Sequence, residues 1–491
     1  MNTNNIVTFS SLEFIFRFLP FFLAVFYLAP FRYRKIVLFL GSLLFYGLGE
    51  PFFLPLLLGL TVVNYWIGNR NASMQWKKAS SAERDCAKQR RHKRFFAVVG
   101  LNVGILCIFK LFGPLHGWFP GAFFWEKAAE IGLPLGLSFY LFKMLSYQAD
   151  CYRGELTEHT FLDAAVYFCM FPQVVSGPIM RFGSMQGILE RNEKKGREQR
   201  LRQIFRRLEE GLFYFTAGLG AKVLLADRLG ILWHELATIG YESISTPLAW
   251  MGAFAYSMQL YFDFAGYSLM AAGIGVMIGL PFIHNFEHPY AADSVRDFFR
   301  RWHMTLGSWF RDYVYIPLGG NRKGRKRCIL NLAFVWLLTG LWHGVTVNFL
   351  IWGMLLFVLI ASEKMFLGPV LERHKIGRHI YVILVMPVTW MVFAITQPGQ
   401  LGIYLGRMFP FLESLFGRAK GVVNTGDFIK YGKQYALLFM TGIICCLPPV
   451  VRWVERRRHR PLVALFMTVV FWSAICLVTN AVSNPFLYFS F

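Results

Sequence analysis

The chain has 491 residues, of which 55% are hydrophobic, 18% aromatic and only 16% charged. A soluble globular protein carries roughly 25% charged residues, so this composition excludes an ordinary soluble protein, and it also excludes a disordered chain. Long, continuously apolar runs predict an all-α polytopic membrane protein, because the strands of a membrane barrel would alternate apolar with polar residues.

The net charge is +23, from 51 Lys and Arg against 28 Asp and Glu. These basic residues cluster in short connectors between the apolar runs, which is the positive-inside pattern of membrane proteins and argues against nucleic-acid binding. The eight cysteines form no CxxC pair, so they are expected to be small buried residues, with neither a disulfide framework nor a zinc site. Four basic connectors are expected in the cytoplasm: residues 69–94, 191–209, 321–327 and 452–460.

A membrane span needs about 20 apolar residues. Gly49, Glu50 and Pro51 predict a turn between two of the apolar runs, and the long run near the middle of the chain is expected to break near Gly344 and cross out and back. Apolar runs occupy residues 12–29, 36–49, 51–68, 95–113, 131–149, 211–229, 249–281, 329–361, 380–396, 434–450 and 462–481.

Two segments do not fit a simple count of crossings. The segment 161–180 is apolar but lies between two connectors that should both be cytoplasmic, and prolines interrupt it. The segment 302–318 has the same problem and also contains Arg311 and Asp312. The first is predicted to be re-entrant or half-spanning, which membrane proteins tolerate only where protein covers the segment, and the second to be an amphipathic or re-entrant helix. The whole chain is then expected to make about 11 to 13 crossings.

His343 is the first candidate for chemistry. It lies in "LLTGLWHGVTVNFLIWGMLLF", deep within an apolar run. An ionisable residue at membrane depth is costly and marks a functional site by default. A buried neutral imidazole suits a general base for a hydroxyl group. A structural histidine, hydrogen-bonded between helices, is the alternative that the sequence leaves open.

His303 is the second candidate, in "FFRRWHMTLGSWFRDYVYIPLGGNR". If this segment is one helix, Trp302, Leu306, Trp309 and Tyr313 share a face, and His303 lies on the neighbouring face. The arginines of this block suit phosphate or carboxylate groups, so a basic cytoplasmic rim is expected to attract a polyanionic, nucleotide-bearing donor. The sequence contains no P-loop, and no third ligand accompanies the histidines at 284 and 288, so no metal site is expected.

Several blocks of this chain match one family of membrane enzymes. The chain resembles the membrane-bound O-acyltransferases, and within them the bacterial alginate O-acetylation group. One departure is Leu269, where the family usually has Asp. The matching blocks are "LSFYLFKMLSYQADCYRG" (137–154), "FPQVVSGPIMR" (171–181), "YFDFAGYSLMAAG" (261–273), "FFRRWHMTLGSWFRDYVYIPLGGNR" (298–322), "LTGLWHG" (338–344) and "NPFLYFSF" (484–491).

The resemblance implies one transmembrane domain over 1–491, a ring of helices around a tunnel, with a catalytic block at about 261–361. His343 matches the family's active-site histidine and would deprotonate a hydroxyl or carry the acyl group itself. His303 matches the second histidine and would orient or polarise the donor carbonyl. Residues proposed to bind substrate are Trp302, Trp309, Arg311, Asp312, Tyr315, Asn321 and Trp342.

The resemblance also implies a reaction and its participants. An acetyl group would pass from a cytoplasmic thioester, acetyl-CoA or an acyl carrier protein, toward a polysaccharide outside. The enzyme would lie in the bacterial cytoplasmic membrane, hold no resident cofactor or metal, and work with a separate extracytoplasmic esterase-like (SGNH-type) protein. Two alternatives remain: D-alanyl transfer to teichoic acid, whose transfer protein shares a similar RWH–WFRDY block, and a transporter or flippase of a lipid-linked sugar.

Overall fold

The computed structural model describes residues 8–72, 81–118, 132–156, 158–186, 188, 197–412 and 425–480. Every regular element in these ranges is helical, which confirms the all-α prediction. The chain divides into two compact units, one from residues 1–215 with 268–283 and the other from 216–267 with 284–491. The expected single domain and the ring of helices around a tunnel stay predictions.

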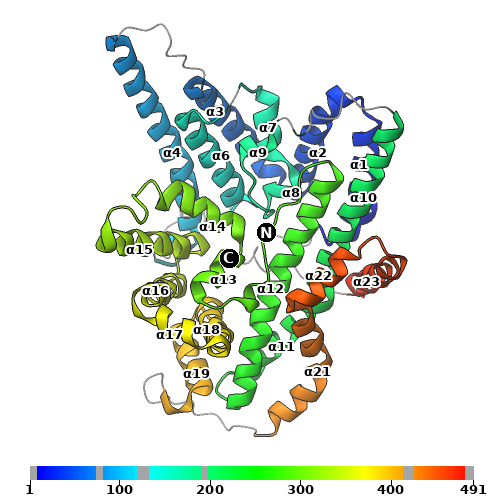
Figure 1. Cartoon of the computed structure of the whole chain (residues 1–491), viewed down its shortest axis with the longest axis vertical. Helices are drawn as coiled ribbons and strands as arrows, with labels where there is room; N and C mark the ends of the chain where they lie inside the picture. The colour runs from blue at the N-terminus through cyan, green and yellow to red at the C-terminus, as the bar shows by residue number, and fades with distance from the viewer. Residues whose placement is uncertain are drawn as a thin grey trace. The chain divides into compact units, whose positions relative to one another are not determined.

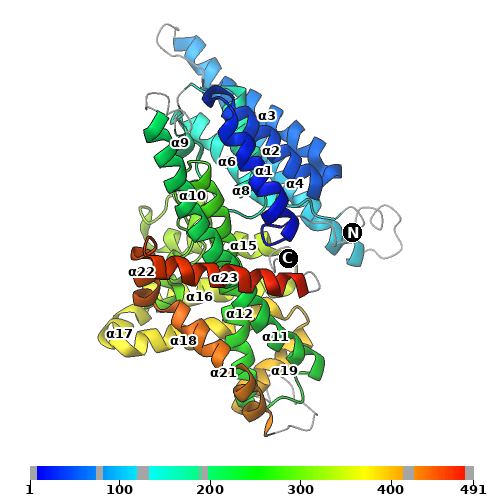
Figure 2. The same ribbon diagram turned by 90° about the vertical axis from the view of Figure 1, so that its right-hand side faces the viewer.

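The first unit is a layer of helices with an aromatic core. Helices α3, α4, α6 and α7 pack on one another, and Figure 2 shows α1, α2 and α3 with similarly inclined axes. The rings of Phe14, Phe18 and Phe45 surround Phe171 at centroid distances of 6.2, 5.4 and 5.5 Å. Its helices are α1 (Leu19–Leu28), α2 (Arg34–Gly49), α3 (Leu54–Ala72), α4 (Ser81–Trp118), α6 (Leu137–Arg153), α7 (Phe161–Cys169), α8 (Phe171–Val174), α9 (Phe182–Met185) and most of α10 (Arg197–Gly220).

The segment 161–180 is broken and buried, as predicted. Helix α7 has nine residues, with a capping box between Thr160 and Asp163, and α8 has only four. Every residue from 164 to 180 is buried. These helices are far shorter than the roughly 20 residues of a span, and the irregular backbone is covered by protein, as it must be at membrane depth.

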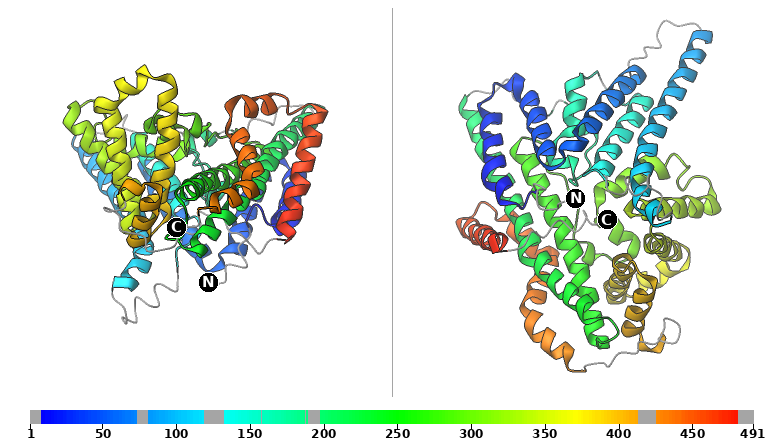
Figure 3. Two further views of the ribbon diagram at one scale, coloured as in Figure 1. Left: turned by 90° about the horizontal axis from the view of Figure 1, so that it is seen from below. Right: turned by 180° about the vertical axis from the view of Figure 1, so that it is seen from behind.

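The second unit holds most of the predicted functional residues. Helix α15 packs against α16, and α16 packs against α18, the yellow helices of Figure 3. Helices α13 and α14, labelled in Figure 1, belong to the same unit and come between α12 and α15 along the chain. Its helices are α11 (Asp227–Ile239), most of α12 (Thr246–Met277), α13 (Val295–Arg301), α14 (Met304–Phe310), α15 (Gly324–His343), α16 (Val347–Ser362), α17 (Gly368–Arg373), α18 (Lys375–Ala394), α19 (Pro398–Met408), α21 (Asp427–Cys446), α22 (Pro448–Arg456) and α23 (Pro461–Asn480).

Six described helices are long and apolar enough to cross a membrane, which confirms a membrane protein. A seventh is added if α21 and α22, which meet at a 70° bend, form one broken span. These counts rest on length and composition within the described residues, where one further apolar helix, Phe14–Leu28, is shorter. The about 11 to 13 crossings expected stay a prediction. The six are Pro51–Ala72, Asp85–Leu111, Thr246–Met277, Val347–Arg373, Lys375–Ala394 and Pro461–Thr479.

The breaks that punctuation residues predict are present. Helix α2 ends at Gly49, and a short 3₁₀ turn, Pro51–Phe53, follows Glu50. The long run 329–361 breaks after His343, where α15 ends, and α16 begins at Val347. The break near Gly344 places His343 at the end of a helix. The closing block at 484–491 lies outside the described residues.

The segment 302–318 is not one helix. The prediction that Trp302 shares a helix face with Leu306, Trp309 and Tyr313 is therefore wrong for Trp302. Helix α13 ends at Arg301, Trp302 is extended, and His303 has a left-handed backbone with φ 44°. Helix α14 then has seven residues, and a five-residue π-helical turn, Arg311–Tyr315, continues it. These elements reach about 18 Å at 1.5 Å per residue, less than the roughly 30 Å of a hydrocarbon core.

We therefore expect both flanks of 302–318 to lie on the same side of the membrane. Single cysteines replacing Arg296 and Arg325, both exposed, would be introduced into a variant whose other reactive cysteines are removed. A membrane-impermeant maleimide should label both positions from the cytoplasmic side only. Labelling of the two positions from opposite sides would show that the segment spans.

Candidate active site

His343 is positioned by the close approach of α15 and α16. A Cβ atom on Gly340 would lie 2.5 Å from the carbonyl oxygen of Phe349, and one on Gly353 would lie 2.6 Å from that of Trp336. Real Cβ atoms do not come this close to backbone oxygens, so only glycine fits at these two crossing points. Small residues allow helix backbones to pack closely in membrane proteins. The hairpin of α15 and α16 thus fixes His343 at its apex.

Aromatic rings surround the His343 imidazole. Trp342 lies at a ring-centroid distance of 4.6 Å, Trp352 at 5.2 Å, Phe393 at 5.0 Å and Phe349 at 6.0 Å. Trp352 is edge-on to the imidazole at 90°, and Phe393 is close to this at 86°. The side chains come from α15, α16 and α18, so packing of three helices determines the orientation of the imidazole.

His303 is positioned by a different segment, the irregular chain at 284–288. The side-chain oxygen of Asn285 lies 3.1 Å from Nδ1 of His303, and it accepts hydrogen bonds from the backbone N–H and hydroxyl of Thr305 at 3.2 and 2.9 Å. The Asn285 carbonyl accepts from the N–H of Met304 at 2.8 Å, and Arg301 accepts from Glu287 at 2.9 Å. A left-handed backbone conformation costs a non-glycine residue of order 1–3 kcal/mol, and these contacts hold His303 in that conformation.

The helix before His303 is anchored to the end of α16. Glu363 accepts hydrogen bonds from the backbone N–H groups of Val295 and Arg296 at 2.6 and 3.0 Å, at the N-terminus of α13. Asp297 pairs with Arg301 at 2.7 Å in the same helix. A carboxylate is favourable at a helix N-terminus, where backbone N–H groups lack partners. The contact ties the RRWH segment to the helix that follows His343.

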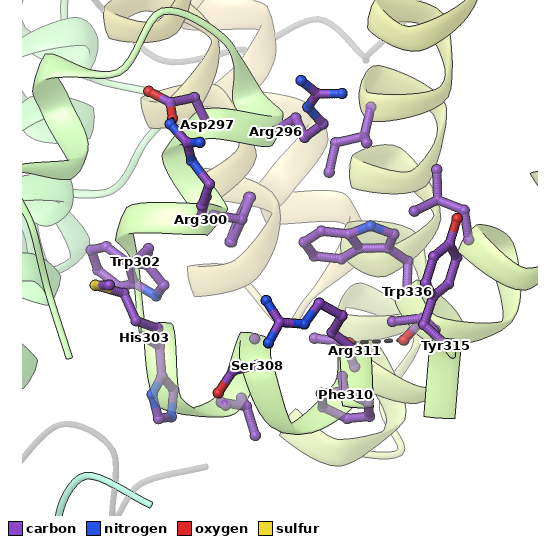
Figure 4. A pocket seen from close by; sticks show the side chains of 18 of the residues that line it. Arg296, Asp297, Arg300, Trp302, His303, Ser308, Phe310, Arg311, Tyr315 and Trp336 are labelled. Atoms are coloured by element: carbon purple, nitrogen blue, oxygen red, sulfur yellow. Dashed lines mark hydrogen bonds and ion pairs between the residues drawn. The ribbon is translucent and has the colours of Figure 1, made fainter. Parts of the chain in front are cut away.

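His303 and His343 line one cavity of about 810 Å³, and all its lining residues belong to the second unit. The Trp342 ring lies near both imidazoles, at a centroid distance of 6.3 Å from His303 and 4.6 Å from His343. Aromatic side chains, including Trp336, Trp352 and Phe393, form much of the wall. Figure 4 shows Trp302 and His303 on one side of this cavity and Trp336 and Tyr315 on the other.

The cavity is basic at its polar end. Arg296, Arg300, Arg311 and Lys364 line it, against the two carboxylates of Asp293 and Asp297. Figure 4 shows the Arg311 guanidinium extending toward the Trp302 side, whereas Arg300 points to Asp297. The excess of cations makes this end suited to phosphate or carboxylate groups.

Burial lowers the pKa of His303 to about 3, so its imidazole is neutral at physiological pH.

The structure brings six of the nine predicted site residues to this cavity. His303, His343, Trp302, Arg311, Tyr315 and Asn321 all line it. The other three are not among its lining residues. Trp309 packs on Phe310 and Tyr313, Asp312 pairs with Arg311 at 2.7 Å, and Trp342 is buried against the rings of both histidines.

Sequence reasoning missed two polar clusters. Lys364 donates to Asn321 and contacts the sulfur of Cys328, each at 2.9 Å, and Tyr315 donates to Asn321 at 2.7 Å. These residues are spread over about 50 positions of the sequence, so no local pattern marks the cluster, although Tyr315 and Asn321 both lie in the block 298–322. Asn285 was also not identified from the sequence, where the neighbouring His284 and His288 were considered only as a metal pair. No group of three or more potential metal-ligating side chains occurs within the described ranges.

A buried ion cluster lies elsewhere in the second unit. Lys222 pairs with Asp227 at 2.5 Å and with Asp263 at 2.9 Å. Asp263 belongs to the block "YFDFAGYSLMAAG", in which Leu269 replaces the family's usual Asp. None of the three lines the cavity. Neutralisation of a buried lysine by two carboxylates joins α12 to the segment before α11, which is a structural role.

Comparison with known proteins agrees with this geometry. The model of the membrane-bound O-acyltransferase (MBOAT) family matches residues 57–405. The chain is 36% identical over 413 residues to a probable alginate O-acetylase, AlgI, of Pseudomonas putida, covering 82% of this chain and 81% of that protein. It is 33% identical over 399 residues to a peptidoglycan O-acetyltransferase of Helicobacter pylori, covering 73% and 71%. A teichoic acid D-alanyltransferase of Bacillus subtilis is 29% identical over 241 residues, covering 47% and 59%.

The match spans both histidine segments, the break between α15 and α16, and most of the helices that surround the cavity. This chain therefore belongs to the membrane-bound O-acyltransferase family and is a membrane-bound acyltransferase.

Proposed function

We propose that this enzyme transfers acetyl groups from a cytoplasmic thioester, acetyl-CoA, for O-acetylation of an extracytoplasmic polysaccharide. The observation that carries the proposal is His343, held at the apex of the α15–α16 hairpin and facing the same cavity as His303. The full-length relatives named as alginate O-acetylase and peptidoglycan O-acetyltransferase support the acetyl group and a polysaccharide acceptor.

His343 would serve as the proton acceptor of the reaction. Its imidazole takes the proton of an attacking hydroxyl, the hydroxyl oxygen bonds to the acyl carbon, and the C–S bond of the thioester breaks. The proton then passes to the departing thiolate. In the relayed alternative, the imidazole nitrogen itself bonds to the acyl carbon as the C–S bond breaks and the thiolate leaves. The hydroxyl oxygen then bonds to the acyl carbon as the N–C bond breaks, and the hydroxyl proton returns to the imidazole nitrogen. Both routes place His343 within reach of the thioester carbonyl.

The donor's chemistry matches the polar end of the cavity. Acetyl-CoA carries phosphates at one end and a thioester at the other, joined by a long flexible arm. Arg296, Arg300, Arg311 and Lys364 line the cavity that also contains His343. Guanidinium groups suit phosphate oxygens, and the apolar aromatic wall suits the uncharged arm. An acyl carrier protein, which presents a similar arm, is the alternative donor.

Acetyl transfer is favoured over D-alanyl transfer by the extent of similarity. The O-acetylating relatives align over 73–82% of this chain, whereas the D-alanyltransferase aligns over 47%. Membership of an enzyme family also makes a flippase of a lipid-linked sugar the weaker reading.

The proposal includes a location and a partner. Basic connectors between apolar helices suit a bacterial cytoplasmic membrane, with the donor on the basic side. The acceptor polymer lies beyond about 30 Å of hydrocarbon, so a second protein is needed outside unless the polymer itself reaches the site. An extracytoplasmic esterase-like protein that receives the acetyl group and passes it to the polymer would meet this need.

His343→Ala should abolish acetyl transfer without loss of the protein from the membrane. Removal of a general base typically costs 10²–10⁴-fold, and loss of an acyl carrier would cost more. The measurement is release of CoA from acetyl-CoA by purified protein, together with the acetyl content of the exported polymer in cells. Membrane abundance is measured by immunoblot of the same cells.

His374→Ala is the matched control, since His374 is exposed between α17 and α18 and does not line the cavity. It should leave transfer at the wild-type rate. Abundant His343→Ala protein that transfers at the wild-type rate would show that the imidazole is structural. Wild-type protein that turns over no acetyl thioester would refute the donor proposed here.

His303→Ala should reduce transfer and leave measurable activity. The residue lies beside the basic end of the cavity, at a helix N-terminus, and does not occupy the apex of the hairpin. The same CoA-release assay would rank the two variants. An inactive His303→Ala beside an active His343→Ala would reverse the roles of the two histidines.

A further inference from the structure

The hydrogen bonds of one buried amide determine which nitrogen of His303 carries its proton. Asn285 is 4% exposed, and its side-chain oxygen faces three groups: Nδ1 of His303 at 3.1 Å, the backbone N–H of Thr305 at 3.2 Å and the Thr305 hydroxyl at 2.9 Å. All three come from the break between α13 and α14. The amide oxygen is therefore the centre of the turn that presents His303.

The orientation of the amide follows from Thr305. A backbone N–H is always a donor, so the Asn285 atom that faces it must be the oxygen and not the nitrogen. The same oxygen faces Nδ1 of His303, and an amide oxygen only accepts hydrogen bonds. Nδ1 must then carry the hydrogen. In a neutral imidazole, which has one N–H, Nε2 is left with a lone pair.

The surroundings of His303 keep its imidazole neutral. The ring is 4% exposed, and it packs edge-on against Phe264 of α12 at 4.6 Å and near Trp342 of α15 at 6.3 Å. Among the groups that contact it are thus two uncharged aromatic rings, from α12 and α15, and the uncharged amide of Asn285. Burial lowers the pKa of His303 to about 3, so no second proton is bound near neutral pH.

We infer that Asn285 is a positioning residue of the acyltransferase site, which locks His303, a residue of the cavity wall, as the Nδ1–H tautomer and leaves its Nε2 as a hydrogen-bond acceptor. An O–H or N–H group is the substrate chemistry that such a nitrogen recognises: the acceptor hydroxyl or an amide N–H of the donor's arm. A carbonyl oxygen is excluded as its partner, because two acceptors do not bond. The inference deepens the proposed function and rests on it for the identity of these groups.

This assignment differs from the expectation that His303 polarises the donor carbonyl. That role would need a hydrogen on Nε2, and therefore an Nδ1 without one. In the structure a tautomer change would set two acceptors, Nδ1 and the Asn285 oxygen, 3.1 Å apart in a buried site. A buried polar contact of this kind is unfavourable, so the amide selects one tautomer strongly.

The tautomer is measured directly by ¹⁵N solid-state NMR of the full-length protein in lipid bilayers, labelled with [¹⁵N]histidine. Subtraction of the His303→Gln spectrum isolates the signals of His303. Wild-type protein should show a protonated Nδ1 and an unprotonated Nε2 between pH 8 and pH 5. Asn285→Ala should populate the Nε2–H form. This readout does not depend on any acyl donor, so it stands apart from the proposed function.

Asn285→Asp tests the same contact in a variant that keeps the acceptor oxygen. The Nδ1–H tautomer should persist at pH 8. The added carboxylate should raise the pKa of His303 by about 1–3 units, because a nearby opposite charge favours the protonated ring. Asn331→Asp is the control, since it buries a carboxylate at a loop contact elsewhere in the second unit, and it should leave the His303 signals unchanged.

Kinetics then test whether Asn285 acts through His303. Asn285→Ala should reduce kcat for acetyl transfer by about 10²-fold, within the range of acid–base contributions, and Asn285→Asp should restore most of it at pH 8. The double variant Asn285→Ala/His303→Ala should be no slower than His303→Ala alone, because both changes remove one interaction.

Three results would overturn the inference. They are an Nε2–H tautomer in the wild type, an unchanged tautomer in Asn285→Ala, and additive losses in the double variant. If wild-type protein shows the expected tautomer and transfers no acetyl group, the proposed function fails and the tautomer assignment survives.

Discussion

The active site depends on the contact of α15 with α16 through Gly340 and Gly353. Each glycine faces a backbone carbonyl of the opposite helix at a distance that no Cβ atom tolerates. Close packing of this kind is the usual way for helices to associate in lipid, where burial of apolar surface gives little advantage. Here it also brings Phe349 and Trp352 against His343. The same hairpin carries Glu363 at its far end, which caps α13. The positions of both histidine segments therefore depend on one pair of helices, α15 and α16.

Local signals in the sequence predicted the elements that local residues determine. Gly344 marks the break that ends α15, Pro172 marks the interruption of 161–180, and the charge content of 302–318 marks a segment that forms no long apolar helix. In each case the breaking residue lies within the element that it breaks. His343 could be selected for the same reason, because an imidazole within an apolar run is visible without knowledge of its neighbours.

The sequence could not predict features that a distant residue determines. The pattern of Trp302, Leu306 and Trp309 suits a continuous helix, yet the helix breaks before His303. The groups that stabilise the break belong to Asn285 and Glu287, 18 and 16 residues from His303 along the chain. The number of membrane spans is also difficult to predict from the sequence, for a related reason. Hydropathy identifies apolar runs, but short helices buried in protein are as apolar as helices in lipid.

The two histidines share a cavity and differ in what their backbones do to a positive charge. His343 is the last residue of α15, beside the carbonyl groups of the helix C-terminus, the end that carries a partial negative charge. His303 precedes the first turn of α14, where N–H groups disfavour a cation, and burial acts in the same direction. In the proposed reaction His343 gains a proton and His303 stays neutral. A neutral His303 can then hold a hydroxyl or an amide N–H in place without competing for the proton that passes to His343.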